Sequence, residues 1–160
     1  MTGTIVAFLR AIGLRVRAGA IAQITALPGI DIDNGALVVD ESCLIHPGDL
    51  LHEAGHLAVV PPARRAGFHH DVGNDPGEEM SAIAWSWAAA LHLQIDPALV
   101  FHNDGYRGGS SAILTAFRDK YYFGVPMLDV AGMTIEPGRA RRQGLSGAIF
   151  PAMRSWLNEA

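Results

Sequence analysis

The residues best suited to chemistry in this chain are two histidines and a glutamate in the segment His52-Glu53-Ala54-Gly55-His56. On a helix, residues four apart lie above one another on one face, so His52 and His56 can point their imidazoles at one metal ion. Glu53 lies one position on, rotated by about 100°, which keeps it off the metal but within reach of a water molecule bound there. This His-Glu-x-x-His pattern is typical of a zinc site that activates water for amide hydrolysis.

The residues around this motif predict the helix that it requires. Asp49 is a good N-cap, and its charge suits a helix N-terminus. Pro61-Pro62 ends the helix. The alternative interpretation is a core helix whose two histidines are solvated or hydrogen-bonded. Apolar side chains flank the motif on both sides, as a buried active-site helix requires: Leu50, Leu51, Leu57, Ala58, Val59 and Val60.

A catalytic zinc ion needs a third protein ligand, and the sequence offers several. The metzincin continuation is excluded, because the positions where it needs Gly and His hold Val59 and Pro62. Cys43 is better interpreted as a small buried residue than as a ligand. A glutamate at the start of the next helix, Glu78 or Glu79, is possible. The polar loop after the motif offers further donors: His69, His70, Asp71 and Asp75.

At this point the chain resembles the gluzincins, and most of all their compact single-domain forms, the minigluzincins. The resemblance rests on the order of motif helix, loop and a helix that opens with Glu followed three residues later by Ala, here Glu79-Met80-Ser81-Ala82. It spans roughly residues 27 to 105. The stretches 47–58 and 77–86 also look like a group of bacterial metallopeptidase-like proteins without assigned function. The resemblance implies zinc bound by His52, His56 and Glu79, with Glu53 catalytic, and it implies no substrate. Glu78 stays the alternative ligand.

The mechanism expected from this set centres on Glu53, which would take a proton from the zinc-bound water and deliver it to the leaving amine. A second electrophile usually holds the oxyanion. Candidates are Tyr106 and His102, after the second helix, and His69 or His70 before it. The alternative interpretations are a loop tyrosine packed on Gly-rich backbone and a solvated pair of surface histidines.

Composition limits the classes of protein that this chain can form. It has 160 residues, 49% apolar and 18% charged, which predicts a single domain over residues 1–160 with a real hydrophobic core. A net charge of −4 argues against nucleic acid as a partner. No apolar run reaches the about 18 residues of a membrane span. The single cysteine, Cys43, excludes a disulfide within the chain and favours a reducing cytoplasm.

The expected fold class is α+β: a mostly helical, zincin-like domain with a small antiparallel sheet next to the active-site helix. Asn34-Gly35 lies between two β-prone runs, 30–32 and 36–39, which is a strong hairpin signal. An N-terminal helix is expected over 4–18, and helices also over 77–93, 110–120 and 151–157, with an extended segment at 127–133.

Three hypotheses follow for function. The leading one is a small cytoplasmic zinc metallopeptidase that acts on a peptide or protein substrate. The second is a non-catalytic module in which zinc braces a helical surface for protein binding or regulation. The third is a metal-free scaffold. The sequence does not indicate an oligomeric state.

Overall fold

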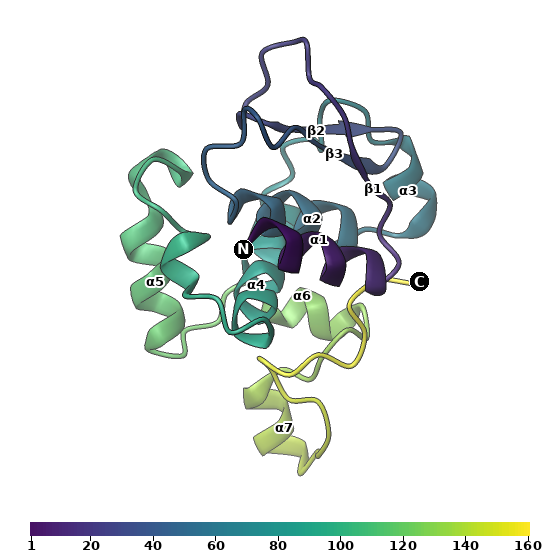
Figure 1. Ribbon diagram of the computed structural model, residues 1–160. Helices are drawn as coiled ribbons and strands as arrows, with labels where there is room; N and C mark the ends of the chain where they lie inside the picture. The colour runs from purple at the N-terminus through teal and green to yellow at the C-terminus, as the bar shows by residue number, and fades with distance from the viewer.

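Two helices, α2 (Asp49–Val59) and α4 (Pro76–His92), lie against each other at the centre of the fold (Figure 1). The structure is a computed structural model that describes residues 1–160, apart from the side chain of Arg107. Within this described part, seven α-helices and three strands form a small α+β fold, in agreement with the predicted class. The other elements are α1 (Thr2–Ala11), β1 (Val16–Ala18), β2 (Ile30–Asp33), β3 (Ala36–Val39), α3 (Pro62–Gly67), the short 3₁₀ helices η1 (Pro97–Leu99) and η2 (Tyr106–Gly108), α5 (Ser110–Arg118), α6 (Val125–Val130) and α7 (Pro137–Gln143).

The sheet is small and mixed, and it lies above the layer that α1 and α2 form (Figure 1). Its strand order is β1-β3-β2. The predicted hairpin is confirmed: β2 and β3 pair antiparallel, and the turn residues Asn34 and Gly35 have φ values of 49° and 71°. β1, however, runs parallel to β3, with Val16 opposite Leu37. The prediction of an antiparallel sheet was therefore correct for the hairpin and wrong for the third strand.

This third strand exists because α1 ends at Ala11, well before the predicted boundary. Gly13 has a φ of 100°, which L residues rarely adopt, and the N–H of Leu14 donates to the carbonyl oxygen of Leu9 at 3.0 Å. These are features of a Schellman helix end. The chain leaves the helix there and forms β1.

Three predicted helices are confirmed: the motif helix is α2, and those over 77–93 and 110–120 are α4 and α5. The polar loop expected after the motif begins instead with a short helix, α3, and Pro62 is its first residue, where its missing N–H costs no helical hydrogen bond. Cys43 is exposed, so its interpretation as a buried residue was wrong.

Two predictions in the C-terminal third were wrong. The segment 127–133, expected to be extended, lies largely in α6, which follows Gly124 in a left-handed conformation (φ 81°). The segment 151–157, expected to be a helix, forms turns. Its backbone makes tertiary hydrogen bonds instead: the carbonyl oxygen of Trp156 accepts from Trp85 Nε1 at 2.9 Å. Contacts distant in sequence decided this segment.

Small residues let α2 and α4 approach each other closely. A Cβ on Gly55 would lie 2.9 Å from the Ala82 carbonyl oxygen and 3.1 Å from Ser86 Oγ. The Ser86 hydroxyl donates to Ala82 O at 2.6 Å and lies 3.2 Å from the Leu51 carbonyl oxygen of α2. The motif helix is thus fixed against α4 by a contact that its own glycine makes possible.

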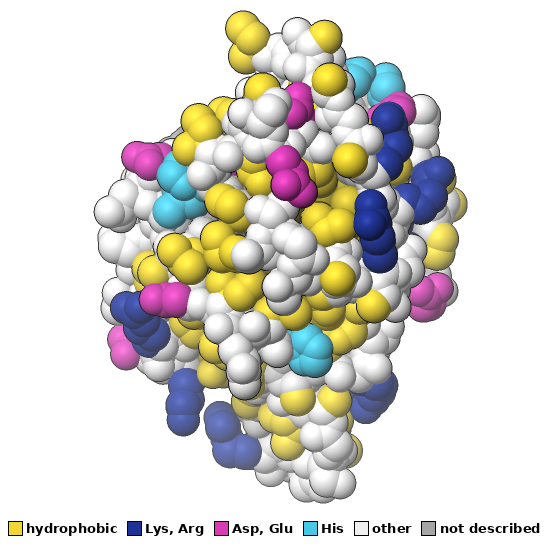
Figure 2. All heavy atoms as spheres, viewed as in Figure 1, with side chains coloured by type: hydrophobic (Ala, Val, Ile, Leu, Met, Phe, Trp, Pro, Cys, Tyr) yellow, Lys and Arg dark blue, Asp and Glu magenta, His cyan; other side chains and the backbone are white. Residues whose placement is uncertain are grey.

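The surface carries both apolar and charged side chains. On the face drawn in Figure 2, hydrophobic side chains occupy much of the middle, and Lys and Arg side chains lie in separate places toward the edge. None of the described helices combines the length and the apolar character that crossing a bilayer requires.

Replacing Gly55 with Ala should lower the free energy of unfolding by about 1–3 kcal/mol, because the added methyl group meets a backbone carbonyl that cannot turn away. Urea unfolding followed by circular dichroism measures the change. Gly3→Ala is the matched control: Gly3 also lies in a helix, and nothing lies within 4 Å of its Cβ position. The control should be neutral or stabilising. Equal stability of the two variants would contradict the close contact of α2 with α4.

Candidate metal centre

The two motif histidines face each other on α2. Their Nε2 atoms are 3.2 Å apart, and their ring centroids are 4.7 Å apart at an interplanar angle of 79°. Their side chains are only 12% and 8% exposed. The four-residue spacing has therefore put both rings on one buried face of the helix, as the sequence predicts.

Glu79 of α4 reaches this pair of rings across the helix contact. Its Oε1 lies 3.6 Å from His52 Nε2, and its Oε2 lies 3.2 Å from His56 Nε2. Glu79 stands in the first turn of α4, one turn before Ala82, where the two helices are close. The structure therefore brings Glu79 next to the two motif histidines.

The neighbouring Glu78 points elsewhere. Its carboxylate forms an ion pair with Arg64 of α3, in which Arg64 Nη2 lies 3.1 Å from Glu78 Oε2. Successive residues of a helix are rotated by about 100°, so only one of the two glutamates can face α2. Of the two ligand candidates left open by the sequence, Glu79 is the one beside the rings.

The spacing of these atoms suits a single metal ion. In a tetrahedral site with bonds of about 2.0–2.1 Å, ligand atoms lie about 3.3–3.4 Å from one another. The three separations here, between the two Nε2 atoms and from each to its nearer Glu79 oxygen, are 3.2, 3.2 and 3.6 Å. A cation between such atoms would remove the mutual repulsion of their lone pairs.

Glu53 belongs to the same group. His52, Glu53 and His56 each offer one ligand atom, and these atoms all lie within 4.8 Å of one another. This group could therefore hold a metal ion. The Glu53 side chain keeps some exposed surface but is mostly surrounded by protein, and this burial raises its pKa, while His56 acts in the opposite direction. A carboxyl with a raised pKa holds a proton more firmly, which suits a general base.

The electrostatics favour a bound cation. Burial lowers the pKa of His52 to about 4, and His56 acts in the same direction. The hydrogen bond from His56 lowers the pKa of Glu79. At neutral pH His52 is therefore uncharged and Glu79 is ionised, which are the states that bind metals.

Tyr106 lies against this centre. Its ring meets the His52 ring edge-on, with centroids 5.0 Å apart. Its hydroxyl is buried and has no hydrogen-bond partner among the described residues. Burial raises the pKa of Tyr106, so the hydroxyl keeps its proton and remains a donor. Tyr106 has a φ of 54°, an uncommon conformation that places its side chain there.

His102, the other candidate electrophile, makes different contacts. Its Nε2 lies 2.8 Å from Asp49 Oδ1, and its ring stacks on His46. The loop histidines also have partners of their own: His69 pairs with Asp33 and His70 with Asp31, both on or at the end of β2. The structure thus brings Tyr106, rather than these histidines, to the His52 ring.

A cavity of about 550 Å³ opens beside the centre. His56, Glu79 and Tyr106 belong to its polar lining, together with Asn74, Asp75 and Glu78. The apolar part of the lining comes from Val72, Pro76, Ile83 and Ile113. A ligand in this cavity would therefore contact His56, Glu79 and an apolar surface at once.

The sequence did not predict the buried partner of His102, and the N-cap predicted at Asp49 was wrong. Gly48 is the N-cap of α2, and the Asp49 carboxylate is buried and accepts from His102 Nε2. Burial raises the pKa of Asp49, and the hydrogen bond to His102 opposes this. An acidic residue at a helix start is favoured by the helix dipole whatever its partner, so nothing in the sequence marked this pair.

Comparisons with protein-family models, with curated proteins and with solved structures found no match for this chain. The interpretation of the centre therefore depends on the residues and their geometry.

The purified protein should hold one tightly bound divalent metal ion that depends on His52 and Glu79. We expect His52→Ala and Glu79→Gln each to weaken its binding by more than about 100-fold, beyond the loss typical of an outer-shell partner. Elemental analysis after dialysis against a weak chelator measures this. Glu78→Gln is the matched control, because Glu78 faces Arg64 and its loss should leave the metal bound. Equal metal retention in Glu79→Gln and Glu78→Gln would contradict the predicted ligand set.

Proposed function

We propose that this chain is a zinc-dependent hydrolase of peptide bonds, of the gluzincin type. The observation that carries the proposal is the convergence of His52, His56 and Glu79 within 3.2 to 3.6 Å of one another, with Glu53 beside them. Two imidazoles and one carboxylate form a known catalytic ligand set for zinc, and three protein ligands leave one position for water. Imidazole nitrogens also favour zinc over magnesium or calcium, which prefer oxygen.

The proposed reaction assigns each side chain one task. Zinc, when bound, lowers the pKa of its water ligand and polarises the scissile carbonyl. Glu53 would take a proton from the attacking water and give it to the leaving amine as the amide C–N bond breaks. The raised pKa of Glu53 supports the first of these transfers. His52 and His56 would hold the ion through their Nε2 atoms.

Tyr106 completes the proposed site as the donor to the oxyanion. Its buried hydroxyl has no partner among the described residues, and a donor kept in that state is available to a charge that develops during the reaction. Its position against His52 and in the wall of the cavity supports this role.

The cavity supports a peptide as substrate. Apolar residues Val72, Ile83 and Ile113 line the space next to Glu79, so an apolar side chain flanking the scissile bond would be buried there. We therefore expect cleavage of short or unfolded peptides, whose backbone can reach the centre.

One observation favours the second candidate function, a zinc-braced binding module. The Glu53 carboxylate is close enough to both rings to act as a fourth ligand itself. A shell of His52, Glu53, His56 and Glu79 would be closed, as structural zinc sites are. The two functions therefore differ in whether Glu53 contacts water or metal.

Replacing Glu53 with Gln separates these functions. For the hydrolase, the amide cannot accept a proton, so peptide cleavage should fall by at least about 100-fold while zinc content stays unchanged. Hydrolysis of a quenched fluorescent peptide library and elemental analysis measure the two quantities. Activity of the wild-type protein should also vanish with chelator and return with added zinc. Loss of zinc from Glu53→Gln would instead support the closed site.

Tyr106→Phe should lower kcat by about 100- to 1000-fold, the range expected when one oxyanion donor is removed, with little change in KM or zinc content. Steady-state kinetics on a peptide identified in the library measures this. Tyr122→Phe is the control, because Tyr122 packs on Phe150, away from the centre. An unchanged kcat in Tyr106→Phe would remove Tyr106 from the reaction.

A further inference from the structure

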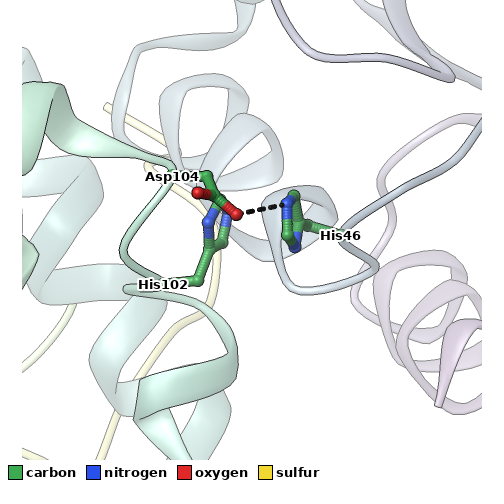
Figure 3. A group of neighbouring side chains, drawn as sticks. All are labelled: His46, His102 and Asp104. Atoms are coloured by element: carbon green, nitrogen blue, oxygen red, sulfur yellow. Dashed lines mark ion pairs between the residues drawn. The ribbon is translucent and has the colours of Figure 1, made fainter.

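A second cluster of metal-ligating side chains lies apart from the centre described above (Figure 3). His46 comes from the segment before α2, and His102 and Asp104 come from the loop between η1 and η2. Each of the three offers one ligand atom, and these atoms all lie within 4.8 Å of one another. His46 Nε2 lies 3.3 Å from Asp104 Oδ2, and Figure 3 draws this pair with a dashed line.

The state of the His102 ring is set by Asp49. His102 Nε2 lies 2.8 Å from Asp49 Oδ1 and donates its proton to that buried carboxylate. In the tautomer that carries its proton on Nε2, the lone pair of the ring is on Nδ1. This Nδ1 is buried and has no hydrogen-bond partner among the described residues. A carboxylate behind one ring nitrogen, with the other nitrogen unpaired, is the arrangement that metal-ligating histidines use.

We propose that His46, His102 and Asp104 form a second site for a divalent metal ion, with His102 Nδ1 as one ligand. Two imidazoles and a carboxylate suit zinc and similar transition metals, whereas magnesium and calcium prefer oxygen ligands alone. The Asp104 side chain is 79% exposed, so the site opens to solvent and water completes the shell. Three ligands on loops, one of them exposed, make this site weaker than the one between α2 and α4.

One rearrangement is required for a shared ion. The His46 and His102 rings are stacked, with centroids 3.7 Å apart and an interplanar angle of 15°, so their lone pairs lie in nearly parallel planes. The His46 ring must turn for both lone pairs to meet one ion. Its side chain is 30% exposed and its polar contact is with exposed Asp104, so this turn breaks no buried hydrogen bond.

An ion bound at this second site would also affect the first centre. Asp49 lies one turn before His52 in α2, and His102 lies in the loop that leads to Tyr106. An ion held by His46 and His102 would therefore fix the Tyr106 loop to the start of the motif helix.

Zinc titration by calorimetry at micromolar concentrations tests the proposal on the full chain. The wild-type protein stripped of metal should bind two equivalents, the second more weakly. Asp104→Asn and His46→Gln should each bind one, with the tight equivalent unchanged. His69→Gln is the matched control, an exposed histidine paired with an aspartate, and it should keep both. A single equivalent in the wild type, or two in both variants, would overturn the proposal.

A second measurement identifies the ligand atoms and does not depend on a variant. Long-range ¹H–¹⁵N spectra of the histidine rings should show, as the second equivalent is added, a shift at His46 and at Nδ1 of His102. Unchanged His46 and His102 resonances would refute the site even if a second equivalent binds. Because His52 and His56 respond to the first equivalent, failure of either site is seen separately from the other.

Discussion

The fold depends on one close contact, in which α2 packs against the backbone of α4. Gly55 lies within the motif and faces Ala82, and no larger residue fits at that glycine without displacing a carbonyl. The same contact that closes the core brings Glu79 to His52 and His56. Packing energy therefore offsets the cost of holding three polar groups together, and the centre needs no separate scaffold.

The core requires buried apolar residues in α4, whereas the candidate metal centre requires an ionised carboxylate. Different turns of the helix supply the two. Its middle is apolar and fully enclosed, with Trp85 in the core. Its first turn emerges at the cavity, where a carboxylate can stay ionised; the Glu79 side chain is 44% exposed. Glu78, one position earlier, forms an ion pair with Arg64. An acidic first turn also suits the helix dipole, so stability and ligand placement favour the same residues.

The features predicted correctly from the sequence are those that depend on local spacing and turn chemistry. The motif helix, the hairpin at Asn34-Gly35 and the two later helices follow from spacing and turn chemistry, and the proximity of Glu53 to both rings follows from helix geometry. Features set by contacts distant in sequence were missed. The parallel strand β1 needs the helix end at Gly13, and the C-terminal turns depend on hydrogen bonds such as that from Trp85. The choice of Glu79 over Glu78 needed the rotation of α4 against α2, which periodicity alone does not provide.

The buried Asp49 carboxylate lies between the two clusters, the one on α2 that contains His52 and the one that contains His102. As the first residue of α2 it lies at the positive end of the helix dipole, and the hydrogen bond from His102 offsets part of the cost of its burial. The bond orients the His102 ring and ties its loop to the helix that carries His52. Tyr106 begins η2 directly after this loop and packs its ring against His52. The start of the motif helix and the loop opposite it therefore hold each other in place, and the position of the Tyr106 hydroxyl depends in part on the Asp49 carboxylate that His102 contacts.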